Sequence, residues 1–375
     1  MKIEMVDLKG QYAHIQQEID HAVLSVIRDA QFINGPEVVA FTEELSQYLD
    51  GAHVIPCANG TDALQIAMMA LDLQPGDEVI VPAFTYVATT EVIGLLHLKP
   101  VMVDVDPISF NVTVDNIRQA ITPKTKAIVP VHLFGQCADM EPILALAKEK
   151  GLYVIEDTAQ AIGASYTFSD GTKKRAGTMG HIGCTSFFPS KNLGCYGDGG
   201  AVYTTDAEMA AKLRMIANHG QVKKYVHKYI GVNSRLDTIQ AAILRIKLRH
   251  LDAYSAARNG AANKYDELLK GIDGLTTPVR QHNSTHVFHQ YTMKIANGKR
   301  DALKKHLEQA GIPAMIYYPV PLNEQEAYKA IGQVIGDLSV THDLCASVLS
   351  LPMHTELTDE QQKFITDTIH TFFKS

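Results

Sequence analysis

The chain has 375 residues, of which 46% are hydrophobic, and its formal net charge at pH 7 is −7. A chain of this length and composition can bury a large core, which excludes a disordered protein. The acidic balance, with lysines and arginines spread along the sequence, argues against nucleic acid or a membrane surface as the main partner and favours a small-molecule ligand.

The cysteines and the N-terminal sequence indicate the cellular compartment of the protein. The five cysteines are scattered and form no CxxC pair, so the sequence predicts neither a zinc site nor a disulfide framework. The stretch MKIEMVDLKG carries charges where a secretion signal needs an unbroken apolar core, and no apolar run approaches the roughly 18 residues of a membrane-spanning helix. We therefore expect a cytoplasmic protein with no metal ion and no membrane partner.

Short β-branched runs alternate with helical stretches between about residues 51 and 205. We expect helices at residues 63–71, 90–98, 114–121 and 142–150, and strands at residues 77–82, 100–106, 126–134, 152–157, 184–188 and 201–205. Strands that are apolar on both sides and separated by helices are typical of a mainly parallel sheet covered by helices on both faces. The sequence predicts an α/β fold.

Helices predominate after residue 206. We expect helices at residues 208–220, 237–270, 302–311 and 358–373, a strand at residues 289–295 and an extended segment at residues 312–319. We interpret residues 1–250 as a large α/β domain with an N-terminal helix, and residues 251–375 as a small C-terminal α+β domain. No low-complexity linker separates them, so the two should pack tightly.

Polar residues at strand and helix ends indicate where a ligand would bind, because ligands of open α/β sheets gather at the carboxyl ends of the strands. In CANGTDALQ, Asn59 and Gly60 form a turn and Thr61 stands where a buried helix begins, which is a ready phosphate site. The alternative is that Thr61 only caps the helix.

A second segment, LYVIEDTAQAIGA, runs from an apolar strand directly into Glu156 and Asp157. A carboxylate at that place is costly unless it has a cationic partner, so it either forms a structural pair or holds a ligand.

The third segment is SFFPSKNLGCYGDGGAV, in which Lys191 follows a strand end and an aromatic pair. Burial would disfavour the ammonium form and make the amine a usable nucleophile. The glycines match neither a Walker A loop nor a dinucleotide fingerprint. A phosphate site, a strand-end Asp157 and a semi-buried Lys191 together suit pyridoxal phosphate, which needs a lysine for its Schiff base and an acid against its ring nitrogen.

Several longer strings carry a family resemblance: ANGTDAL, PAFTYVAT, EDTAQAIGASY, SFFPSKNLGCYGDGGAV, GVNSRLDTIQAAIL and YYPVPLN. They resemble the DegT-type sugar aminotransferases of the aspartate-aminotransferase superfamily, and the likeness covers the chain from about Met5 to the final helix. It implies the fold type I architecture, with a large α/β/α domain and a smaller C-terminal α+β domain. Among the members, the sequence is most similar to those that aminate the 3-keto group of UDP-linked N-acetylhexosaminuronic acids for surface polysaccharide such as the O-antigen of lipopolysaccharide.

The resemblance implies roles around the cofactor ring. Lys191 matches the Schiff-base lysine, which also moves protons between cofactor and substrate. Asp157 matches the acid on the pyridinium nitrogen, and Gln160 matches the residue near the ring hydroxyl. Tyr86 matches the aromatic residue stacked on the ring face; its alternative is an ordinary core tyrosine. The matching phosphate-binding residues are Gly60, Thr61 and Ser186.

The resemblance also implies a homodimer with shared sites, because Asn233 matches an asparagine that reaches the phosphate of the neighbouring subunit. Arg235 is a candidate for binding the sugar acid group or the donor carboxylate, with a structural salt bridge as the alternative. Many relatives have His-Tyr-Pro where this chain has Tyr317-Tyr318-Pro319, and both tyrosines are candidates for substrate binding. Tyr317 cannot become cationic near neutral pH and would hold a uronate less strongly, so neutral deoxysugars stay open.

Three histidines, His282, His286 and His289, could suggest a metal site. They span a turn and a strand with alternating faces, so we expect structural roles for them.

The leading hypothesis is a two-stage aminotransferase. Lys191 holds pyridoxal phosphate, glutamate converts the cofactor to pyridoxamine phosphate, and the amine passes to a nucleotide-linked keto-sugar. An acceptor such as a dTDP- or UDP-linked 3-keto or 4-keto 6-deoxyhexose stays open. Sugar dehydratases of the same superfamily carry histidine in place of the lysine, so Lys191 argues against them. A non-catalytic cofactor-binding regulator is expected to lose part of the residue set or to gain a DNA-binding segment.

Overall fold

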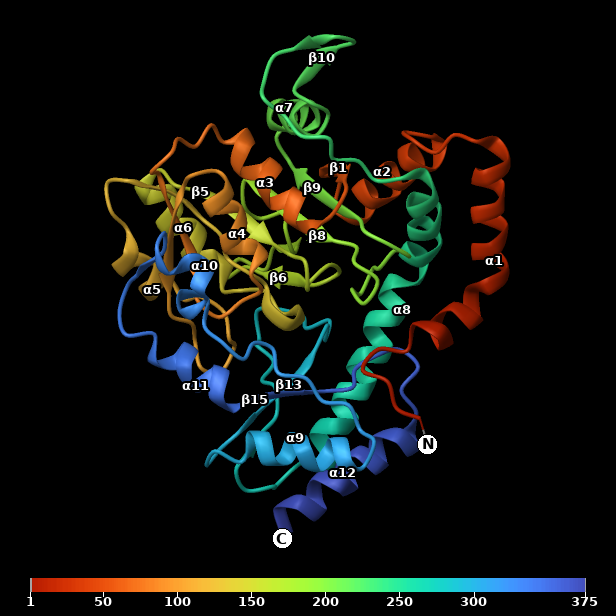
Figure 1. Cartoon of the computed structure of the whole chain (residues 1–375), viewed down its shortest axis with the longest axis vertical. Coiled ribbons are helices and arrows are strands. Elements are labelled where there is room, and N and C mark those ends of the chain that lie inside the picture. The colour runs from red at the N-terminus through yellow and green to blue at the C-terminus, as the bar shows by residue number, and fades with distance from the viewer. Residues whose placement is uncertain (1, 375) are drawn as a thin grey trace.

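A computed structural model describes residues 2–374 and centres on an eight-stranded sheet. Its order is β1-β9-β8-β5-β4-β2-β3-β14. Figure 1 labels β1, β9, β8 and β5 of this sheet. The strands are β1 (His53–Cys57), β2 (Glu78–Pro82), β3 (Lys99–Val103), β4 (Thr125–Ile128), β5 (Tyr153–Asp157), β8 (Ile182–Ser186), β9 (Gly200–Thr204) and β14 (Gln333–Val334). Seven of these strands run in one direction and β9 alone runs in the opposite direction, so the predicted mainly parallel sheet is confirmed.

Helices cover both faces of the sheet, as the apolar strands require. Val79 and Val81 of β2 pack into one buried cluster, whereas Ile80, between them, packs into another. The first cluster includes residues of α3 (Gly60–Ala70), α4 (Ala88–Leu95) and α7 (Ala207–Ala217), and the second includes residues of α5 (Val114–Ala120), α6 (Met140–Lys150) and α11 (Ser339–Ser347). Successive residues of a strand point to opposite faces, so β2 is buried from both sides.

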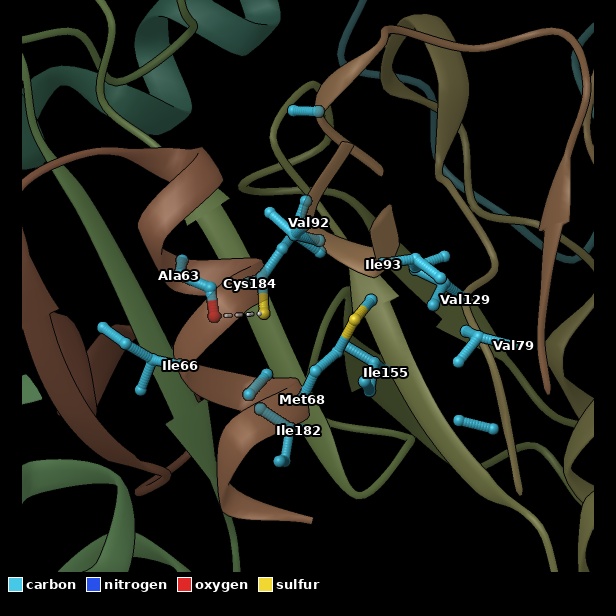
Figure 2. Close-up of a cluster of buried hydrophobic side chains, with 14 of the residues drawn as sticks. Ala63, Ile66, Met68, Val79, Val92, Ile93, Val129, Ile155, Ile182 and Cys184 are labelled. Atoms are coloured by element: carbon cyan, nitrogen blue, oxygen red, sulfur yellow. Dashed lines mark hydrogen bonds between the residues drawn. The ribbon is translucent and has the colours of Figure 1, made fainter. Parts of the chain in front are cut away.

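The core between α3 and the sheet is drawn in Figure 2. Ala63, Ile66 and Met68 of α3 lie against Ile182 and Cys184 of β8. The Cys184 thiol donates to the Ala63 carbonyl at 3.4 Å. This packing fixes the start of α3 beside the end of β8, where two of the three sequence segments converge.

A second, smaller sheet lies in the lower part of Figure 1. It has the order β12-β13-β15, formed by β12 (Leu275–Thr276), β13 (Tyr291–Ile295) and β15 (Val348–Leu351). It shares a core with α9 (Arg300–Gln309), α12 (Asp359–Lys374) and the end of α8 (Thr238–Leu268). This part corresponds to the predicted small α+β domain.

The boundary expected between residues 250 and 251 falls inside the continuous helix α8. The C-terminal part also returns to the large sheet, because β14 pairs in parallel with β3. The Asp104 carboxylate accepts from the backbone N–H groups of Val340 and Thr341, which fixes the start of α11. Residues 333–347 therefore pack with the large sheet although they lie between β13 and β15 of the small sheet in sequence.

Two helices precede the first strand, α1 (Leu8–Asp29) and α2 (Pro36–Tyr48), where the sequence predicted one. Arg245 of α8 binds Glu37 and Glu44 of α2, which ties the two helices together. The remaining short elements are β6 (Ser165–Thr167), β7 (Lys173–Arg175), β10 (Gln221–Lys223), β11 (Val226–His227), α10 (Glu326–Lys329) and the 3₁₀ helices η1 (Leu133–Gly135) and η2 (Leu322–Glu324). In residues 2–374, no helix has both the length and the apolar character to span a bilayer.

Candidate active site

A cavity of about 790 Å³ opens at the carboxyl ends of β5 and β8. Residues from both parts of the chain form its wall. Those predicted from the sequence that line it are Gly60, Thr61, Tyr86, Asp157, Gln160, Ser186, Lys191, Tyr317 and Tyr318. Asn233 and Arg235 are not among the lining residues.

The start of α3 forms one end of the cavity. The Asn59 carboxamide oxygen accepts from the Asp62 N–H at 2.8 Å, so Asn59 is the residue that caps this helix. The alternative role considered for Thr61, helix capping, is therefore wrong. Its hydroxyl is available to a ligand, together with the N–H groups of the first helical turn, and this combination suits a phosphate.

Two glycines let the chain pass closely at this end of the cavity. A Cβ at Gly60 would lie 2.7 Å from the Ser186 Cβ, and a Cβ at Gly200 would lie 2.5 Å from the Asn59 carbonyl oxygen. Both distances are well below van der Waals contact. The absence of a side chain at Gly60 is thus what brings the start of α3 against Ser186, the last residue of β8.

Replacing Gly60 with alanine should separate these two elements. We expect the variant to bind pyridoxal phosphate at least about tenfold more weakly and to lose about 1–3 kcal/mol of stability, because overpacking at a rigid contact costs that much. Absorbance titration with the cofactor and thermal unfolding measure the two effects. Gly260→Ala, within α8, is a matched control, since a Cβ there would meet no atom within 4 Å beyond the helix's own backbone. Equal cofactor affinity in both variants would contradict the close-contact argument.

Asp157 ends β5 and is 6% exposed. One carboxylate oxygen accepts from the Thr89 hydroxyl at 2.8 Å, and the other accepts from the Ala159 N–H at 3.1 Å. No lysine, arginine or histidine of the described chain forms an ion pair with it. The carboxylate is therefore held in place at the cavity wall with its charge available to a cationic group.

The neighbouring Glu156 has a different role. It is fully buried and accepts from the N–H groups of Gly177, Met179 and Gly180. His132 contacts it through Nε2 at 2.9 Å, and its Nδ1 accepts from a backbone N–H, so Nε2 carries the proton and donates. These four donors satisfy the carboxylate, and of the two acids only Asp157 faces the cavity.

Glu156→Gln should destabilise the fold without removing a cavity residue. One oxygen becomes an NH₂ group that faces N–H donors, so we expect a loss of about 2–4 kcal/mol in the free energy of unfolding. Urea unfolding measures it. Glu43→Gln, on the exposed side of α2, is the control and should stay within about 0.5 kcal/mol of the unmodified protein. Similar midpoints for both variants would show that the buried network contributes little.

Lys191 follows β8 after a tight turn in which its N–H donates to the Phe188 carbonyl at 2.8 Å. Its side chain lines the cavity and its amine has no hydrogen bond or ion pair within residues 2–374. Burial lowers the pKa of the amine to about 8, against the opposing effect of the Asp157 charge. A larger fraction of the amine is therefore neutral and nucleophilic near pH 7 than for an exposed lysine.

Gln160 connects the cavity to Tyr318. Its carboxamide oxygen accepts from the Phe134 N–H at 2.8 Å, and its NH₂ group donates to the Tyr318 hydroxyl at 2.9 Å. Burial raises the pKa of Tyr318 well above the ordinary value. Tyr86 is 57% exposed and its ring lies 6.3 Å from that of Tyr318. The structure thus places Tyr318 as a support for Gln160, and Tyr86 and Tyr317 line the same cavity.

Asn233 and Arg235 lie on the segment before α8. Asn233 is exposed and pairs with Asn218 through an isolated bridge. Between Asn233 and Arg235, the Ser234 hydroxyl accepts from the Ala58 N–H at 2.9 Å, which holds this segment beside the start of α3. Arg235 is half-buried and forms no ion pair with the described residues, so the salt bridge considered for it is not observed.

Sequence reasoning did not identify several lining residues. His289 and Gln290 belong to the cavity wall, although His289 was expected to be structural. His286 does have such a role, since its Nδ1 accepts from the Phe288 N–H and its ring stacks on that of Phe288. A pattern of alternating faces cannot distinguish these histidines, because it does not say which face meets a cavity.

The residues present fit pyridoxal phosphate. The start of α3 with Ser186 suits its phosphate, Asp157 suits a protonated ring nitrogen, and the free amine of Lys191 suits its aldehyde. The unpaired charge of Asp157 and the unpaired amine of Lys191 are the observations that carry this fit, since both groups are costly to leave without partners.

The family model described as the DegT/DnrJ/EryC1/StrS aminotransferase family matches residues 13–370. One relative, named UDP-2-acetamido-2-deoxy-3-oxo-D-glucuronate aminotransferase, comes from Pseudomonas aeruginosa; it is 47% identical over 97% of this chain and 98% of its own length. Another, from Acidithiobacillus ferrooxidans, is named UDP-N-acetyl-3-dehydro-alpha-D-glucosamine 3-aminotransferase and is 47% identical over 96% of this chain and 95% of its own length.

Among solved structures, DesV of S. venezuelae superposes with a TM-score of 0.95 at 38% sequence identity, covering 100% of this chain and 99% of that one.

Proposed function

This chain belongs to the DegT/DnrJ/EryC1/StrS aminotransferase family, and we propose that it moves an amino group from glutamate to the 3-keto group of a UDP-linked N-acetylhexosaminuronic acid. Aminotransferases of this family use pyridoxal phosphate. The observation that carries the proposal is the convergence of Lys191, Asp157 and the start of α3 on one cavity. Both relatives of 47% identity carry names that specify a UDP-linked sugar oxidised at position 3.

The residues predicted to contact the cofactor have separate tasks in this proposal. When bound, pyridoxal phosphate supplies an electron sink that stabilises negative charge on the carbon undergoing amino transfer. Asp157, oriented by Thr89 and Ala159, keeps a proton on the ring nitrogen. Gly60, Thr61 and Ser186 would hold the phosphate, Gln160 would lie near the ring hydroxyl, and Tyr86 would cover the ring face.

Lys191 moves the protons. Its Nζ takes a proton from the donor carbon in the first stage and returns one to the sugar carbon in the second. A pKa of about 8 makes this amine effective in both directions, because a base and acid near the working pH exchange protons readily.

Among the described residues, the cavity of one chain lacks a cation besides Lys191 that could bind the carboxylate of the sugar acceptor. Lys191 is the only lysine or arginine among the described residues that line the cavity. A uronate carboxylate therefore needs a cation from elsewhere, and Arg235 has a free guanidinium to offer. The tyrosines Tyr317 and Tyr318 contribute hydroxyl and aromatic surface to the same wall. One specific observation favours a second candidate, a neutral 3-keto N-acetylglucosamine or a 6-deoxyhexose: the phenol of Tyr317 stands where a histidine is common.

We place the enzyme in the cytoplasm as a homodimer with shared sites, in a route to surface polysaccharide such as the O-antigen of lipopolysaccharide. The hairpin of β10 and β11, which projects at the top of Figure 1, supports the dimer. It is followed by Ile230, which is 88% exposed, and includes the turn residue Tyr225, which is 83% exposed. Apolar side chains so exposed on a projecting segment favour coverage by another chain. Asn233 and Arg235 would then act on the partner's cavity.

The test is amination of a panel of nucleotide-linked keto-sugars with glutamate as donor. The panel contains UDP- and dTDP-linked 3-keto and 4-keto sugars, with and without a carboxylate, and mass spectrometry detects the product. We expect the UDP-linked 3-keto uronic acid to react fastest, and Arg235→Gln to slow this acceptor more than its neutral counterpart. Strong preference for a neutral 6-deoxy acceptor would overturn the proposed substrate while leaving the aminotransferase assignment intact.

A further inference from the structure

The imidazole of His289 lies on the wall of the cavity that contains Lys191, at the start of the small sheet. The residue is 6% exposed. The cofactor-directed residues come from the large sheet and its loops, whereas His289, Gln290 and Tyr317 come from the C-terminal part of the chain. This wall is therefore the one left for the substrate.

The ring nitrogens of His289 have hydrogen-bonding capacity that the protein does not use. Nδ1 is buried and has no hydrogen-bond partner. Nε2 has one contact, to the carboxamide nitrogen of Gln290 at 3.5 Å, which is the outer limit of a hydrogen bond. Buried polar groups are nearly always paired, so an unpaired imidazole beside a ligand cavity points to a partner supplied by the ligand.

The surroundings keep this imidazole uncharged. Burial lowers the pKa of His289 well below its ordinary value, and the cations of Lys191 and Arg258 add to the effect. Arg258 is itself 3% exposed and forms no ion pair with a described carboxylate. A neutral imidazole offers one donor and one acceptor and no positive charge. It therefore matches a hydroxyl or an amide, which can use both ring nitrogens, better than a carboxylate, which can only accept.

The backbone around His289 is held rigidly. The Arg258 guanidinium donates to the carbonyls of Phe288 at 3.0 Å and of His289 at 3.4 Å. On the other side, the carboxamide of Asn192, the residue after Lys191, donates to the Val287 carbonyl at 2.9 Å. This hydrogen bond links the segment that carries the imidazole to the segment that carries the reactive amine, as a preorganised site requires.

We propose that His289 determines acceptor specificity by hydrogen-bonding an uncharged polar group, a hydroxyl or an acetamido amide, of the nucleotide sugar beside Lys191. The inference rests on the proposed function and adds a specificity-determining residue to it. It replaces the structural role that the sequence pattern suggested for His289.

The test separates sugar binding from the reaction with glutamate. UDP-N-acetylglucosamine, which has no keto group and cannot react, is titrated into the cofactor-loaded protein by calorimetry. Glutamate turnover of the cofactor is followed by absorbance in single-turnover mixing. His289→Phe should weaken sugar binding about 10- to 100-fold, the loss expected when a buried hydrogen bond is removed, and change the glutamate rate by less than about twofold.

Two further variants serve as conservative replacement and control. His289→Asn keeps a donor and an acceptor and should recover at least about threefold of the lost affinity. His282→Asn, on the exposed turn nearby, should behave as the unmodified protein. Unchanged sugar binding in His289→Phe, or equal losses in sugar binding and glutamate rate, overturns the His289 proposal alone. Failure of the unmodified protein to bind the UDP-sugar overturns the proposed acceptor and the His289 proposal together.

Discussion

Replacing Lys191 with alanine is expected to lower amino transfer by at least about 10⁴-fold, the largest effect of any single substitution in the chain. The amine is the covalent attachment point for the cofactor and the group that moves protons at the reacting carbons. Among the described residues, no other lysine or arginine lines the cavity, so none can take over. Single-turnover absorbance with glutamate, followed by product detection with a keto-sugar acceptor, measures the loss.

The matched control is Lys148→Ala, which removes an exposed lysine near the end of α6. It should retain full activity.

A pH series adds a second check on Lys191. Its pKa of about 8 predicts that the rate at which the cofactor-free protein takes up pyridoxal phosphate rises with pH and levels off above about pH 8, because only the neutral amine attacks. A rise that continued beyond pH 10 would indicate an exposed, ordinary lysine.

Asp157→Asn should lower turnover by about 10²- to 10³-fold while leaving the fold intact. Asparagine has nearly the same shape. Its oxygen can accept from the Ala159 N–H, and its NH₂ group can donate to the Thr89 hydroxyl, which is able to accept as well as donate. Asparagine has no charge, however, and cannot keep the cofactor ring nitrogen protonated. The loss should therefore appear in both half-reactions, with a shift of the cofactor absorbance, and with little change in the unfolding temperature.

Asp157→Glu and Asp29→Asn complete this experiment. Glutamate restores the charge at a displaced position and should recover part of the activity. Asp29 is an exposed carboxylate at the end of α1, so Asp29→Asn controls for the change in net charge. If Asp157→Asn kept more than about a tenth of the activity, the carboxylate would have a structural role, as one interpretation of the sequence allowed.

The sheet could be predicted from the sequence where its strands are apolar on both faces. The segment expected at residues 77–82 corresponds to β2, which contributes alternate residues to two separate cores. The strand expected at residues 126–134 ends at Ile128, because Pro130 has no N–H to donate and the chain then turns into a short 3₁₀ segment. The strands β1 and β14 were missed, since β1 contains Pro56 and β14 has two residues. Neither shows a periodic pattern, and tertiary pairing alone defines them.

The site residues could be predicted where a reactive or charged side chain stands at the end of a strand or just after it. Lys191 and Asp157 stand after buried strands, and parallel strands present their carboxyl ends at one edge. His289 and Gln290 could not be identified in this way, because they precede β13 of the other sheet and reach the cavity only through the packing of the two parts. The side chains of Asn233 and Arg235 lie outside the cavity of their own chain, so a single sequence or a single chain leaves their roles as predictions.

In the proposed function, amino transfer to a nucleotide-linked keto-sugar runs through Lys191, and a nitrogen-label experiment follows that transfer. The cofactor-loaded protein is treated with ¹⁵N-glutamate, freed of excess donor, and mixed with the UDP-linked 3-keto N-acetylhexosaminuronic acid. We predict that one labelled nitrogen per active site appears on the sugar, and that Lys191→Ala transfers none on the same timescale. An unlabelled sugar from the unmodified protein, or full transfer by Lys191→Ala, would contradict amino transfer through Lys191.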